Sequence, residues 1–108
     1  MSKDYDKNNI FAKILRSEIP CNKILENKHA LAFSDINPQA PIHVLIIPKK
    51  SYINFYDFIK NASIKEVEFF WKLVNDTIIL NKISKKGFRV ISNSGDDGNQ
   101  DVPHFHVH

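Results

Sequence analysis

The first half of the chain alternates between helical and extended patterns of apolar residues. Four apolar residues fall on one face of a short helix: Ile10, Phe11, Ile14 and Leu15. We expect Pro20 to stop this helix, since proline cannot continue the backbone hydrogen-bond pattern. Residues 23–26 and 30–34 predict two short strands, and residues 43–47 predict a buried strand that Pro48 ends.

The second half predicts two helices followed by two strands. Residues 53–59 are rich in aromatic side chains and predict a short helix, and the Ser-Ile-Lys-Glu sequence at 63–66 has the spacing of a capping box. It opens a long helix with these apolar residues on one side: Ile64, Val67, Phe70, Trp71, Val74 and Ile78. Residues 88–92 and 102–108 predict the last two strands. We therefore expect an α+β domain with a mainly antiparallel sheet of about five strands, one long helix and one or two short ones.

The last five residues, His-Phe-His-Val-His, carry the strongest chemical signal. In an extended strand His104, His106 and His108 share one face, while Phe105 and Val107 face a core. A neutral imidazole is a good nucleophile toward phosphorus, and three imidazoles also offer ligands to zinc. The spacing alone does not separate phosphate chemistry from a metal site. For phosphate chemistry, His106 is the natural nucleophile because it has an imidazole on each side.

A polar loop at residues 93–100 leads directly into the histidine strand. Gly95 and Gly98 allow backbone N–H groups to approach an oxyanion closely, and Asn93 and Gln100 add neutral amide donors. Three acids oppose a phosphate here unless they face solvent: Asp96, Asp97 and Asp101. The loop and the strand together favour phosphate chemistry.

Two residues near the buried strand fit more than one role. His43 precedes the apolar run, where a lone histidine is more often structural than catalytic. Asp35 either caps a turn, which is the commoner case, or accepts hydrogen bonds from a ribose diol.

Length, charge and cysteine content narrow the class of protein. The 108 residues predict a single domain spanning 1–108. The net charge of +3 comes from scattered lysines, which indicates a solvated surface and no nucleic-acid partner, and helps to attract an anionic substrate. The single cysteine, Cys21, fits a reducing compartment, and no apolar run has the length of a signal peptide or a membrane span. We expect a cytoplasmic protein with no membrane partner.

Three ordered blocks of the sequence resemble the histidine-triad (HIT) superfamily, and its Hint branch in particular. They lie at 10–20, at 31–49 with its Pro-Gln-Ala-Pro element, and at 100–108. The resemblance implies a HIT-like fold whose sheet continues across a homodimer, with the long helix and residues 87–92 at the interface. It implies binding of a purine nucleotide, such as AMP, GMP or a derivative, and hydrolysis of nucleoside phosphoramidates, with no cofactor.

The same resemblance assigns roles to individual residues. His106 attacks phosphorus and forms a nucleotidyl-histidine intermediate, His104 orients it through its backbone carbonyl, and His108 contacts the phosphate with His43 in support. Further phosphate contacts match Asn93, Gln100, Asp101 and Val102. Asp35 matches the ribose-binding acid. The apolar slot for the base, which otherwise resembles core, matches Ile10, Phe11, Ile14, Phe33, Ile36 and Leu45.

The sequence departs from the family pattern in three places. Asn9 and Ala12 occupy the positions of a zinc-holding cysteine pair, so we predict no metal. Asp101 replaces a serine, and it repels phosphate when ionised or supplies a proton when protonated. The family's C-terminal tail is expected to be absent after His108, and residues 1–8 to form a flexible N-terminus. Alternative functions are dinucleoside polyphosphate hydrolysis and non-catalytic nucleotide binding or scaffolding.

Overall fold

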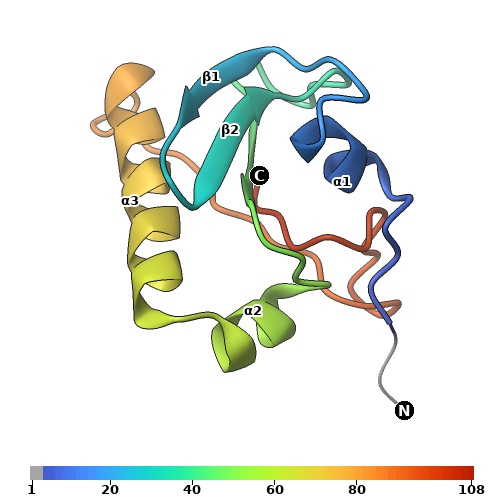
Figure 1. The fold of residues 1–108 in the computed structure, drawn as a ribbon. Helices are drawn as coiled ribbons and strands as arrows, with labels where there is room; N and C mark the ends of the chain where they lie inside the picture. Colours follow the sequence, from blue (N-terminus) through green and yellow to red (C-terminus); the bar gives the residue numbers. More distant parts are fainter. Residues whose placement is uncertain (1–3) are drawn as a thin grey trace.

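A three-stranded antiparallel sheet with helices on both faces forms the protein (Figure 1), as seen in a computed structural model that describes residues 4–108. The elements follow one another as α1 (Ile10–Leu15), β1 (Lys23–Glu26), β2 (Ala30–Ser34), β3 (Val44–Pro48), α2 (Phe55–Asn61) and α3 (Ile64–Leu80). The strands are ordered β1-β2-β3. The expected α+β class with an antiparallel sheet is confirmed.

Side chains of the central strand β2 alternate between two apolar clusters. Ala30 and Ala32 lie in a first cluster, which α2, α3 and the C-terminal segment share with one face of the sheet. Leu31 and Phe33 lie in a second cluster on the other face, together with Phe11 of α1. Because the sheet is covered on both faces, β2 and β3 are apolar at almost every position, unlike strands of a half-exposed sheet, whereas the edge strand β1 begins and ends on the exposed Lys23 and Glu26.

The helix boundaries follow from their capping side chains. Ser63 and Glu66 form the expected capping box at the start of α3, where the Ser63 hydroxyl accepts from the Glu66 N–H at 3.1 Å. α2 begins two residues later than predicted because the Asn54 side chain caps it, accepting from the Asp57 N–H at 2.9 Å. α1 ends at Leu15, well before Pro20, as the chain turns through a left-handed conformation at Ser17 with φ of 61°.

The expectation of about five strands is corrected to three within the described residues. The two segments expected as the last strands pair only at isolated points: residues 88–92 have no regular structure, and residues 102–104 form a bend. Val107 pairs with Ile46 of β3 through backbone bonds of 3.0 and 3.1 Å, and Ile91 exchanges bonds of 3.1 and 2.8 Å with His108. The ladder does not extend further back because the Phe105 N–H donates to Tyr52 O at 2.7 Å instead of to a strand.

Part of the N-terminal segment packs against the folded body. Residues 1–3 of the expected flexible N-terminus lie outside the described residues, whereas Tyr5 and Asp6 contact the folded body. Among residues 4–108, no helix combines the length and the apolar character needed to cross a membrane.

Candidate active site

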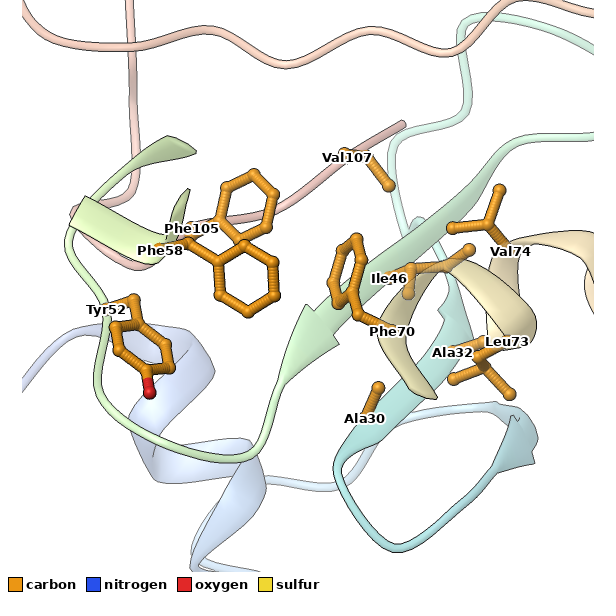
Figure 2. Close-up of a cluster of buried hydrophobic side chains, with 10 residues drawn as sticks. All are labelled: Ala30, Ala32, Ile46, Tyr52, Phe58, Phe70, Leu73, Val74, Phe105 and Val107. Atoms are coloured by element: carbon orange, nitrogen blue, oxygen red, sulfur yellow. The ribbon is translucent and has the colours of Figure 1, made fainter. Parts of the chain in front are cut away.

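Two buried apolar side chains anchor the C-terminal histidine segment. Phe105 and Val107 belong to the first cluster, and Figure 2 shows the Phe105 ring beside those of Phe58 and Phe70. The ring centroids of these neighbours are 4.8 and 5.0 Å from that of Phe105. Since successive side chains of an extended segment point to opposite sides, the intervening histidines face the other way, toward Phe11 of α1.

The hydrogen bonds of His106 leave one ring nitrogen available for chemistry. Its Nδ1 lies 2.7 Å from the backbone oxygen of His104, an atom that only accepts, so Nδ1 carries the proton and donates. In the neutral ring Nε2 then keeps its lone pair. The Asp101 carboxylate oxygen Oδ1 is 3.6 Å from Nε2, and the Asp101 side chain is 77 % exposed. The fold thus places the buried His106 ring beside a carboxylate that faces solvent.

His104 is held neutral at the base of the site. Its Nε2 donates to the backbone oxygen of Pro48 at 2.9 Å, and its side chain is fully buried. Burial, which disfavours the charged ring, lowers the pKa of His104 to about 4 despite the favourable Pro48 contact. At neutral pH the ring therefore carries a single proton, on Nε2.

Hydrogen bonds that run from the Gln39 backbone through His43 set the tautomer of His108. The Gln39 backbone N–H donates to His43 Nδ1 at 2.9 Å, so the proton of a neutral His43 is on Nε2. His43 Nε2 lies 2.9 Å from His108 Nδ1, which accepts from it, and His108 keeps its own proton on Nε2. Burial and the neighbouring His106 and His43 lower the pKa of His108. A neutral His108 with an Nε2–H can donate to a phosphate oxygen.

Asp35 lies beside the hydrogen bonds that link Gln39, His43 and His108, and it also caps a turn. Its Oδ1 accepts from the Asn37 N–H at 2.8 Å, which is the turn-capping role, and its Oδ2 lies 3.4 Å from His43 Nε2. The geometry of Asp35 is therefore compatible with both roles, capping the turn and accepting from a ribose diol, because its second oxygen faces the site.

Within residues 4–108, Asp35, His43 and His108 form a group close enough together to be considered as ligands of a metal ion. Ligand atoms of Asp35, His43 and His108 lie within 4.8 Å of one another. However, a metal-bound histidine donates its other ring N–H to an acceptor, whereas His43 Nδ1 here accepts from the Gln39 N–H. His43 Nε2 consequently carries a proton and offers no lone pair. The hydrogen bonds therefore match a proton-bearing network and do not match a ligand set.

The glycine loop is held together by Gln100. The Gln100 side-chain oxygen accepts from the Gly95 N–H at 2.9 Å, and its amide donates to Ile53 O at 2.6 Å and Val102 O at 2.9 Å. This side chain, expected at the phosphate, is thus engaged by the protein. A Cβ at Gly98 would lie 2.4 Å from Ser94 O, so only glycine permits this fold of the loop.

The other expected phosphate residues surround the histidine segment. Asn93 is half-buried and follows Ser92, whose hydroxyl donates to His106 O at 3.0 Å. Val102 is half-buried against the second cluster. Asp96 and Asp97 are exposed, so their charges face solvent.

The structure brings together four of the six residues expected at the base slot. Phe11, Phe33 and Leu45 are buried in the second cluster and Ile14 packs against it. Phe11 also meets the His106 ring edge-on, with 4.9 Å between centroids, so the cluster borders His106. The remaining two are on the surface: Ile10 is 41 % and Ile36 77 % exposed.

Three contributors to the site were missed from the sequence. Pro48 supplies a carbonyl, Gln39 a backbone N–H, and Tyr5 a hydroxyl 2.5 Å from His104 Nδ1. Backbone groups leave no residue-type signal. Tyr5 is 99 positions from its partner, so no local pattern links the two.

Comparison with known proteins shows which family the chain belongs to. The HIT domain model matches residues 16–108, which is most of the chain. The chain belongs to the HIT family. It is 50 % identical to an uncharacterized 13.2 kDa HIT-like protein of Azospirillum brasilense, over all of this chain and 88 % of that protein.

Solved structures of HIT proteins share the fold. A HIT family hydrolase from Legionella pneumophila superposes with a TM-score of 0.86 at 36 % identity, covering 94 % of this chain and 89 % of that one. A histidine triad nucleotide-binding protein from Candida albicans superposes with a TM-score of 0.83 at 31 % identity, covering 94 % of this chain and 72 % of that one. The HIT fold is therefore common to this chain and to proteins from bacteria and a yeast.

Proposed function

We propose that this HIT protein binds a purine nucleotide and hydrolyses nucleoside phosphoramidates through a nucleotidyl-histidine intermediate on His106. The observation that carries the proposal is the 2.7 Å bond from His106 Nδ1–H to His104 O, which leaves the Nε2 lone pair free. The names of the Legionella hydrolase and the Candida nucleotide-binding protein support the same class of function.

The first step forms the bond between His106 Nε2 and the α-phosphorus while the P–N bond breaks. The departing amine takes a proton that comes from solvent water and is passed on by the exposed Asp101 carboxylate beside Nε2. The imidazole becomes cationic, and its Nδ1–H stays on the His104 carbonyl, which stabilises that charge. In the second step water attacks phosphorus and gives a proton to the Asp101 carboxylate, and the P–Nε2 bond breaks to restore neutral His106.

The remaining site residues bind and orient the nucleotide in this proposal. His108 donates Nε2–H to a non-bridging phosphate oxygen, and His43 holds the His108 tautomer. Asp35 accepts from the ribose hydroxyls, and the base packs against Phe11 and its apolar neighbours in the second cluster. Asn93 and the backbone at 100–102 add phosphate donors. The protein needs no cofactor for these steps and acts in the cytoplasm.

We also propose that two copies of the chain pair through the open side of α3. A groove of about 510 Å³ runs between α3 and the segment at 87–91. Its rim exposes Ile42 by 45 %, Phe88 by 47 % and Val90 by 46 %. Covering these side chains with the same surface of a second copy removes apolar area from water and extends the sheet. A Phe88→Asp variant that keeps the dimeric mass in light scattering would contradict this interface.

The proposed activity is tested by following AMP release from adenosine 5′-phosphoramidate by liquid chromatography. We expect His106→Ala to lower kcat by about 10³-fold or more, because the reaction loses its nucleophile. His29→Ala is the matched control, since His29 lies against Phe69 and away from the site. Equal turnover by His106→Ala and wild type would refute the mechanism. A preference for diadenosine polyphosphates, or tight AMP binding without turnover, would favour the two alternative functions.

A further inference from the structure

The N-terminal segment places a tyrosine against the first histidine of the triad. The Tyr5 hydroxyl lies 2.5 Å from His104 Nδ1, and the two rings meet edge-on with centroids 5.6 Å apart. Tyr5 is half-buried and His104 fully buried. The contact joins the two ends of the described chain.

Several bonds hold this segment against α1. The buried Asn9 caps α1 through its Oδ1, which accepts from the Ala12 N–H at 2.9 Å. Its Nδ2 donates to Asp6 O at 2.7 Å, directly next to Tyr5. Arg16 at the end of α1 donates to Lys7 O at 2.9 Å. Asn9 therefore connects the backbone beside Tyr5 to the helix that borders the site.

The direction of the Tyr5 bond follows from the other nitrogen of the ring. His104 Nε2 faces the Pro48 carbonyl oxygen, which only accepts, so Nε2 carries the single proton of the neutral ring. His104 Nδ1 is then an acceptor, and the Tyr5 hydroxyl donates to it. Each ring nitrogen has one partner of the correct kind, and moving the proton to Nδ1 would break the bond to Pro48 O and reverse the direction of the Tyr5 bond.

We propose that Tyr5 is a positioning residue for the hydrolytic reaction: its hydroxyl holds the His104 ring, and the held residue keeps its carbonyl oxygen on His106 Nδ1–H. This inference rests on the function proposed above. Because His104 O and the His104 ring belong to one residue, a shift of the ring moves the acceptor that orients the nucleophile. Tyr5 bonds to His104 and to none of the groups assigned to phosphate or ribose, so it affects kcat and leaves nucleotide binding unchanged.

The test compares Tyr5→Phe with wild type in two measurements. Phenylalanine keeps the ring contact and removes only the donor. We expect kcat for adenosine 5′-phosphoramidate to fall by about tenfold with KM unchanged within about twofold, because small displacements of reacting groups cost this much. In ¹⁵N-histidine NMR, we expect the His104 Nδ1 resonance to move toward that of an imidazole lone pair without a donor, while Nε2 stays protonated.

Tyr52→Phe is the matched control, since it also removes a buried tyrosine hydroxyl bond, from Tyr52 to Glu66 Oε2 at 2.6 Å. We expect it to lower the melting temperature while kcat and the His104 resonances stay at wild-type values. Unchanged His104 resonances in Tyr5→Phe, or a kcat equal to that of wild type, would overturn the proposal. If wild type itself releases no AMP, the proposed function fails, and the NMR comparison still decides whether Tyr5 holds the His104 ring.

Discussion

Truncating Phe105 tests whether the core side of the histidine segment supports its reactive side. Phe105 is fully buried and packs against Phe58, Phe70 and Phe55, with centroids 4.8, 5.0 and 5.6 Å away. Phe105→Ala removes the whole ring from this cluster, and such changes cost about 3–5 kcal/mol, part of it from the cavity left behind. A domain of this size has a total stability of about 5–15 kcal/mol, so the loss is a large fraction of it.

The assay is thermal unfolding followed by circular dichroism, with kinetics on the folded variant. One kcal/mol corresponds to about 4 °C for a domain near 100 residues, so we expect the melting temperature to fall by about 12–20 °C. We also expect kcat to fall at temperatures where the variant is folded, because Phe105 lies between His104 and His106. Phe55→Ala is the control, since Phe55 is 40 % exposed and its truncation costs about 1 kcal/mol. If Phe105→Ala melts no lower than Phe55→Ala, the segment is not anchored by this ring.

Three further outcomes are expected. Asp101→Asn lowers kcat by about 10²-fold or more for phosphoramidates whose amine is a poor leaving group, and by less for activated leaving groups that need no proton. Equal losses of kcat across a series of leaving groups would exclude Asp101 as the group that passes the proton to the amine. The free energy of unfolding rises with pH between about 4 and 6.5, because burial lowers the pKa of His104 to about 4 and the unfolded chain therefore binds more protons in this range. The rise of at most about 3 kcal/mol is measured by urea unfolding, and a His104→Phe variant with the same pH dependence of stability would contradict its assignment to His104. Gly98→Ala displaces the loop at residues 93–100, because the added Cβ would lie 2.4 Å from Ser94 O. We expect this variant to bind AMP more weakly in calorimetry, and a wild-type affinity would show that the loop does not contact phosphate.

Local signals were sufficient for the helices and the first three strands. The capping box at Ser63 placed the start of α3 correctly, and the Asn54 cap, which no pattern singled out, moved α2 by two residues. The last two segments were predicted as strands from alternation alone. Alternation of apolar and polar residues indicates which face of a segment is buried, but a β-ladder also needs backbone hydrogen-bond partners on a neighbouring strand. The Phe105 N–H instead donates to Tyr52 O, which is outside the strands.

The histidine face was predictable because an i, i+2 spacing on an extended segment has a single geometric outcome. The surroundings were less predictable. No local pattern indicated that the Gln100 side chain closes the loop, where its oxygen accepts from a backbone N–H and its amide donates to backbone oxygens. Ile10 and Ile36 were expected at the base slot and lie on the surface. Such outcomes depend on contacts between distant residues, which periodicity does not encode.

The contact between Tyr5 and His104 also has a kinetic consequence for folding. It spans 99 positions, so it closes a loop of almost the whole described chain, and such closure is entropically costly until the intervening parts are compact. The sole tryptophan, Trp71, lies on α3 beside Phe70, with 5.1 Å between ring centroids, and its fluorescence reports the formation of the core. During refolding from urea, the last roughly tenfold of kcat therefore returns after the tryptophan signal, when Tyr5 reaches His104.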